Sequence, residues 1–352
     1  MAQLEYENTR IRSLKKDLLA PEFYDRLLQA NTPEEMVNLF NETVYGSDVS
    51  AAVILDPGYR GIERGLKDNL SRTFAKVNHF FAPENRYLAE ILLGRFDIWN
   101  VKAVIRGKHI GATAEEIMEA VLPAASLTEP LIRSLAEAVD IKGVIDLLVI
   151  WNFPYAKVLR DAYEEYRDTG KLLPVELAMD FEFYRRSLEL LESRRKDLDA
   201  SLLSEFLRQE IDFLNIMTAI RLNNEKVSSK EAERFFVPGG RKLSLKLFKE
   251  IVELPEIELI ADRLVGTPYV KVAQEGLKRY FKTGYVSSFQ RALEEFSVRQ
   301  AAKLFLANPL SAALLIAFFY TKHNEVTNLR IIVRGKSVGM DEQEIREAMI
   351  VV

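Results

Sequence analysis

The 352-residue chain contains no cysteine and only three histidines, His79, His109 and His323. Without cysteine it has no disulfide, no zinc–thiolate site and no thiol nucleophile. The histidines lie on separate segments, and no two have the spacing of the helical zinc motif of metalloproteases. We therefore expect no metal centre and no histidine-based catalysis, and no cofactor is predicted.

The chain also lacks a strong charge of one sign and a long apolar run. Its formal net charge is −4, so a nucleic-acid partner is not expected. The most apolar run, residues 309–320 (PLSAALLIAFFY), is well short of the ~20 residues that span a bilayer. We interpret this run as a buried core helix. The N-terminal segment is charged and has no apolar signal-peptide region, so we expect a soluble protein.

Motifs of common catalytic sites are missing as well. Gly335-Lys336-Ser337 ends like a phosphate-binding loop, but that motif needs a glycine at position 330, where this chain has arginine, and a preceding strand. There is no nucleophile elbow, no dinucleotide glycine fingerprint and no carboxylate pair whose spacing indicates acid–base chemistry. No catalytic residue is predicted.

What the chain does contain is one 27-residue stretch, present three times without internal gaps: Asp97–Pro123, Asp212–Pro238 and Glu325–Val351. An acidic residue begins each copy, an asparagine follows after three positions and an arginine after nine. The copies start 115 and 113 residues apart, a period too long for a solenoid repeat and suitable for a small domain. The matching residues are Asp97, Asn100 and Arg106; Asp212, Asn215 and Arg221; Glu325, Asn328 and Arg334.

Each copy has the pattern of two helices joined by a turn. At 100° per residue, four apolar side chains of each copy fall within an arc of about 120°, which is typical of a core-facing stripe. The asparagine lies roughly 120° from the arginine, so the two should face different neighbours. The stripes are Ile98, Val101, Val104 and Ile105; Phe213, Ile216, Ala219 and Ile220; Val326, Leu329, Ile332 and Val333.

The turn and the second helix also have recognisable signals. Gly107 and Gly335 follow the arginine, where a left-handed C-cap is expected. Three pairs with capping-box spacing, the last in an acidic version, then begin the second helix: Thr113 with Glu116, Ser228 with Glu231, and Asp341 with Glu344. Pro123 and Pro238 end it.

The repeated polar residues have two interpretations. They can satisfy caps and ion pairs inside each repeat, or they can contact a shared partner. The sequence leaves both open.

No segment shows sustained period-two alternation, so we predict an all-α protein. The repeats divide it into three similar helical domains, residues 1–124, 125–240 and 241–352, with the clearest linker at Pro238–Lys242. By analogy with oligomers, three like domains could be related by pseudo-threefold symmetry.

Several of these motifs resemble the C subunit of the archaeal and bacterial A-type/V-type ATPases, or ATP synthases, whose eukaryotic counterpart is the d subunit of the V-type ATPase. They are FNETVYGSDV at 40–49, NVKAVIRGK at 100–108, NLRIIVRGK at 328–336 and FFVPGG at 235–240. The resemblance covers the whole chain and implies an all-helical, funnel-shaped rotor protein without an active site. It also implies two partners: the D and F subunits of the central stalk, and the membrane rotor ring of proteolipid subunits.

In that family the protein transmits torque between ATP chemistry and proton or sodium-ion transport. The resemblance thus implies a cytoplasmic protein, peripheral to the cell membrane, that reaches the membrane only through the complex. Two other classes remain open. A helical adaptor of a soluble complex would bind its partner without membranes, and a helical-core enzyme would need a deep polar pocket for which the sequence offers no candidate.

Overall fold

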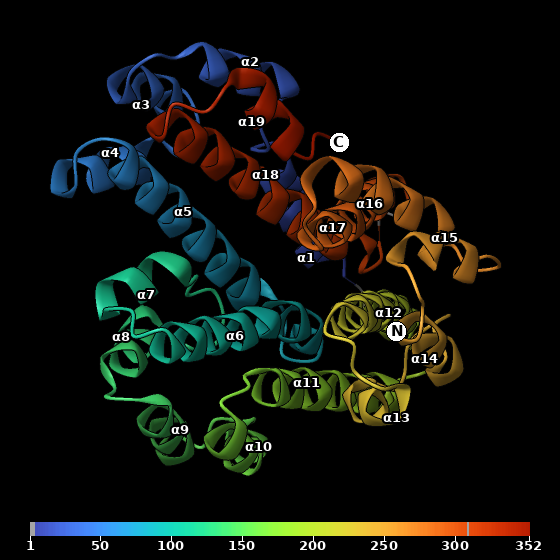
Figure 1. Ribbon diagram of the computed structural model, residues 1–352. Helices are drawn as coiled ribbons and strands as arrows, with labels where there is room; N and C mark the ends of the chain where they lie inside the picture. Colours follow the sequence, from blue (N-terminus) through green and yellow to red (C-terminus); the bar gives the residue numbers. More distant parts are fainter. Residues whose placement is uncertain (1–3, 308–309) are drawn as a thin grey trace. The chain divides into compact units, whose positions relative to one another are not determined.

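The computed structural model describes residues 4–307 and 310–352. Within these ranges the chain forms nineteen α-helices and three short 3₁₀ helices, and no strand (Figure 1). The prediction of an all-α protein is confirmed. The chain folds into two compact units, one containing the residues up to Val144 together with Gln300–Val352, the other Ile145–Arg299.

The first unit combines the beginning and the end of the sequence. Helix α18 packs against α5, α1 and α2, and Figure 1 shows it lying beside α5. Stacked rings join the two helices, with the centroids of Phe74 and Phe319 5.1 Å apart. The helices are α1 (Glu5–Lys15), α2 (Pro21–Gln29), α3 (Pro33–Asn41), α4 (Gly46–Leu55), α5 (Tyr59–Phe80), α6 (Arg86–His109), α7 (Ala114–Ala120), α8 (Glu129–Glu137), η3 (Leu304–Leu306), α18 (Ala313–Ser337) and α19 (Glu342–Ala348).

In the second unit, α12 packs against α11 and α14. Phe213, Tyr269 and Phe296 meet edge to face in its core. Helices α9 (Ile141–Ile150) and α17 (Ser287–Lys303) cross the limits between the units. The others are α10 (Ala156–Thr169), α11 (Leu173–Ser193), α12 (Leu198–Asn224), α13 (Ser229–Ala232), η1 (Glu233–Phe235), α14 (Leu245–Val252), η2 (Ile257–Leu259), α15 (Ile260–Arg263) and α16 (Val270–Thr283).

The three repeated stretches form helix pairs as predicted. Each begins inside a long helix and continues through a turn into a short one: α6 with α7, α12 with α13 and α18 with α19. All twelve side chains of the predicted apolar stripes are buried. Thr113 and Glu116 form a complete capping box, and Ser228 and Asp341 cap the other two short helices. The domain limits at 124/125 and 240/241 and the threefold relation stay predictions.

The prediction that Gly107 and Gly335 are left-handed C-caps is wrong. Both lie inside their helices, which continue for part of a turn. The left-handed residues come four positions later, at Gly111 (φ 73°) and Gly339 (φ 68°), with Lys226 (φ 56°) in the second copy. Gly107 and Gly335 instead allow the short helix to approach closely, as discussed below.

The apolar run near residue 310 forms the start of α18, where the side chains from Ala313 to Tyr320 are buried. Pro309 of this run lies outside the described residues. No helix in the described part of the chain has the length and apolar character needed to cross a bilayer.

Candidate functional site

The asparagine of each copy holds the chain that follows the short helix. Its amide donates to the carbonyl oxygen, and accepts from the N–H, of the residue 22 positions later. The partners are Leu122 (both 2.7 Å), Val237 (2.7 and 2.8 Å) and Ile350 (2.8 and 2.9 Å). Asn100, Asn215 and Asn328 are at most 1% exposed. Each amide therefore satisfies a buried backbone donor and acceptor. The carbonyl oxygen of Ile350 also accepts from Asn324.

The acidic residue of each copy binds the start of another helix. Asp97 accepts from the N–H of Leu127, just before α8 (2.9 Å), and Asp212 accepts from that of Leu243, just before α14 (3.0 Å). Glu325 accepts from the N–H of Leu19, just before α2, at 2.5 Å. In all three cases the donor immediately precedes the N-cap residue: Thr128, Ser244 and Ala20.

We call these contacts junctions. The first junction joins α6–α7 to α8, the second joins α12–α13 to α14, and the third joins α18–α19 to α2. The first two connect segments that follow each other in the chain. The third connects residues 306 positions apart.

A buried tyrosine completes the second and third junctions. The hydroxyl of Tyr269 donates to Asp212 at 2.6 Å, and that of Tyr45 donates to Glu325 at 2.6 Å. Burial, together with the neighbouring carboxylate, raises the pKa of both tyrosines well above the usual value. The two residues occupy the same kind of turn, because the N–H of each donates to the hydroxyl of a threonine two positions earlier.

The three arginines have different neighbours from the buried asparagines, as the helical wheel predicts. Arg106, Arg221 and Arg334 are all exposed. Arg334 binds Glu63 of α5 together with Arg330. Burial alone would raise the pKa of Glu63, but the two guanidinium groups hold it below the usual value. The structure thus separates the nine repeated residues into six buried ones that hold backbone groups and three exposed ones.

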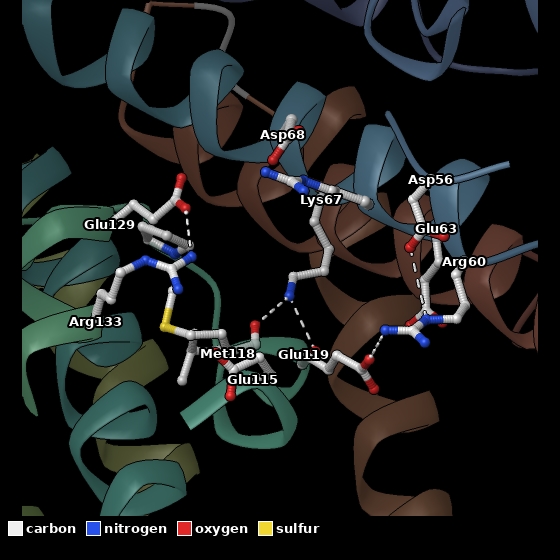
Figure 2. A pocket seen from close by; sticks show the side chains of 13 residues that line it. Asp56, Arg60, Glu63, Lys67, Asp68, Glu115, Met118, Glu119, Glu129 and Arg133 are labelled. Atoms are coloured by element: carbon white, nitrogen blue, oxygen red, sulfur yellow. Dashed lines mark hydrogen bonds and ion pairs between the residues drawn. The ribbon is translucent and has the colours of Figure 1, made fainter. Parts of the chain in front are cut away.

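A charged cleft of about 230 Å³ lies between α5, α7 and α8 (Figure 2). Lys67 reaches into it and donates to the carbonyl oxygens of Met118 and Glu119, both at 2.9 Å, at the end of α7. Burial, with Arg330 nearby, lowers the pKa of Lys67 to about 8. Arg60 spans from Asp56 to Glu119 across the same cleft. The cleft is lined by charges of both signs, and the contacts of Lys67 and Arg60 tie α5 to α7.

Gly335, Lys336 and Ser337 form the last turn of α18 rather than a loop after a strand. In the part of the chain that the structure describes, no three metal-binding side chains gather at one point.

Similarity to known proteins extends over nearly the whole chain. Residues 8–348 match the model of the ATP synthase (C/AC39) subunit family. The chain is 32% identical to the C subunit of the A-type ATP synthase of Methanococcoides burtonii over 98% of its own length and 94% of that protein. It is 30% identical to the protein of the same name from Halorubrum lacusprofundi, over 99% and 97% of the two chains. It is 27% identical to the C subunit of the A-type ATP synthase of Methanocaldococcus jannaschii, over 99% of its own length and 87% of that protein.

The chain belongs to the ATP synthase (C/AC39) subunit family. Members of this family are non-catalytic subunits of rotary ATPases, so the chain is not an enzyme by itself. The resemblance inferred from the sequence motifs is confirmed.

Several residues of the junctions were missed by sequence reasoning. Leu19, Leu127 and Leu243 were not predicted, although Leu127 and Leu243 follow their acids by 30 and 31 positions. That nearly constant spacing was a usable signal. It does not extend to Leu19, which lies near the other end of the chain. Tyr45 and Tyr269 carried no signal in the sequence that could have placed them beside an acid.

Proposed function

We propose that this protein is the C subunit of an A-type ATPase and that it links the central stalk to the membrane rotor ring. Family membership over residues 8–348 carries the proposal, because the similarity leaves almost no part of the chain for another role. The relatives named as A-type ATP synthase proteins support the type of ATPase. In this role the protein transmits torque for ATP-coupled transport of protons or sodium ions.

The proposed partners are the D and F subunits of the stalk and the proteolipid subunits of the ring. The protein is cytoplasmic in this proposal and reaches the cell membrane only through these partners. A rotor part that transmits torque must resist deformation, and the first and second junctions support this requirement. Each fixes the beginning of a helix to a long helix with hydrogen bonds to one carboxylate.

At the level of residues, we propose that the acids and asparagines of the repeats serve the fold. Their side chains are buried and bound to backbone groups. We assign the exposed face of Arg106, Arg221 and Arg334 to contacts with partners. We also propose that residues 1–124, 125–240 and 241–352 are three repeats of one domain, related by a pseudo-threefold axis in a funnel-shaped body.

Reconstitution tests the linking role. The ATPase is assembled with and without this protein in vesicles, and ATP hydrolysis and ion uptake are measured together. Without it, we expect the head and stalk either to dissociate from the ring or to hydrolyse ATP without ion uptake. Fully coupled transport in its absence would overturn the proposal and would favour an adaptor of a soluble complex.

The same assay tests the three arginines. Replacing Arg106 alone with alanine should change coupling little, because three repeats distribute the contacts. The triple variant Arg106→Ala/Arg221→Ala/Arg334→Ala should reduce coupling and increase its sensitivity to salt. Arg160→Ala, which removes an exposed arginine of α10, is the matched control. If the triple variant couples like the control, the arginines do not face the partners.

A further inference from the structure

The three junctions are built alike, although only two of them join neighbouring segments. The first helix beyond each junction buries a matching stripe: Leu27 in α2, Leu135 in α8 and Ile251 in α14 are all 0% exposed. The next position is also buried in each, at Leu28, Ala136 and Val252. By its contacts, α2 therefore holds the place after α19 that α8 holds after α7.

Surface ion pairs support this equivalence independently. Arg346 of α19 binds Asp25 of α2 at 2.6 Å, and Figure 1 shows these two helices side by side. In the second junction, Glu233 of η1 binds Lys249 of α14 at 2.5 Å. Asp25 follows Leu19 by the same number of positions as Lys249 follows Leu243. The pair is thus present in both junctions with its charges exchanged.

The third junction differs in its connection. Seven residues, 121–127, lead from Ala120 at the end of α7 to the N-cap of α8. No such short connection leads from α19 to α2, because the two helices are joined only through the whole chain between them. When the third junction opens, no short connection to α19 limits the movement of α2. Helix α2 stays attached through residues 16–20 to α1, which packs against α18.

The third junction also has a buried cation that the other two lack. Lys322 donates to Glu325 at 2.9 Å and to the hydroxyl of Tyr45 at 2.7 Å, and Lys322 and Glu325 are each 3% exposed. The matching positions in the other copies are Gly94 and Gln209. A buried ion pair contributes geometry more than net stability, because desolvation offsets its attraction. The buried pair of the third junction therefore fixes the alignment of the helices that meet there but adds little net stability.

We propose that the third junction is a reversible closure: α2 and α3 separate from α18 and α19 as one unit while the first and second junctions stay closed. Helix α18 stays packed against α5 and α1 while α2 and α3 move. This inference concerns the fold alone and does not depend on the proposed rotor role.

Hydrogen exchange of the full-length chain, resolved by helix, tests the proposal. Amides of α2 and α3 should exchange through one common opening, at least about tenfold faster than those of α8 and α14. Glu325→Gln should accelerate both α2 and α3 by a further factor of about ten, with α8 and α14 unchanged. Asp212→Asn, the matched change in the second junction, should leave α2 and α3 at the wild-type rate.

Two further variants make the result decisive. Tyr45→Phe removes the two hydrogen bonds of the hydroxyl, with Glu325 and with Lys322, and keeps the ion pair between those two residues. It therefore gives a smaller acceleration of the same helices even if Glu325→Gln does not fold. A circular permutant, in which a flexible linker joins Val352 to Met1 and new ends lie between α7 and α8, removes the short connection of the first junction and should accelerate the exchange of α8. The proposal is overturned if α2 and α3 exchange as slowly as α14, if they respond separately, or if α8 of the permutant exchanges as slowly as in the wild type.

Discussion

Gly107 of α6 lies so close to Ile117 of α7 that a Cβ atom on the glycine would be 2.4 Å from Cγ1 of the isoleucine. Gly335 and Ile345 repeat this contact in the third copy, with a corresponding distance of 2.5 Å. In the second copy the sizes are exchanged. Leu222 occupies the glycine position and Ala232 the isoleucine position, and both are buried in the same core. The three helix pairs therefore fill similar space with opposite choices of large and small side chains.

This exchange predicts a compensating pair of substitutions. Gly107→Leu should destabilise the first unit by about 1–3 kcal/mol, because the new side chain overfills the contact with Ile117. The double variant Gly107→Leu/Ile117→Ala should recover at least half of the loss, since it recreates the second copy. Urea unfolding of the wild type, both single variants and the double variant measures the coupling. Strictly additive effects would contradict the prediction.

The buried asparagines should contribute more to stability than the exposed arginines of the same helices. Asn215→Ala leaves the N–H and carbonyl oxygen of Val237 without their partner, so we expect a loss of about 2–4 kcal/mol. Arg221→Ala, six positions further along α12, should change stability by no more than about 0.5 kcal/mol. Chemical denaturation of the two variants checks the difference. Equal losses would show that the amide bridge is not a main source of stability.

Lys67 should make the free energy of unfolding depend on pH in the alkaline range. Burial lowers its pKa in the folded chain from 10.5 to about 8, so between these values the unfolded chain binds more protons. The contribution of Lys67 to the free energy of unfolding therefore increases as pH rises from about 8 to 10.5. NMR titration of labelled lysines should show one midpoint near pH 8. The stability difference between wild type and Lys67→Met should change over the same interval, and a constant difference would contradict the assignment.

Three tyrosines should make the stability of the chain fall as pH rises, opposite to the effect of Lys67. Burial and the nearby charge of a carboxylate raise the pKa of Tyr24, Tyr45 and Tyr269 above the usual 10. Above pH 10 the unfolded chain therefore loses protons that the folded chain keeps, and stability falls as pH rises. The ultraviolet absorbance of tyrosinate should show these three of the 13 tyrosines ionising only as the chain unfolds. Tyr269→Phe should reduce the alkaline loss of stability, and an unchanged loss would exclude its role.

The sequence by itself determined the helix pairs, their N-terminal caps and their apolar stripes. A helix, its cap and its apolar stripe depend on residues three to seven positions apart, so three ungapped copies specify the same local structure. For the same reason Asn100, Asn215 and Asn328 reach residues at one constant spacing. The missing catalytic motifs and the family resemblance were equally readable, because both depend on short stretches of sequence.

The tertiary structure alone decided which segment an acid of the repeats binds when that segment lies far from the acid in the sequence. Nothing near Glu325 in the sequence indicates Leu19 or Tyr45, because that contact depends on the path of the chain through some 300 residues. It also decided the role of Gly107, since a glycine after a helical stripe is equally compatible with a cap and with a close approach. The low pKa of Lys67 arises in the same way, from burial by helices distant in sequence that no local pattern encodes.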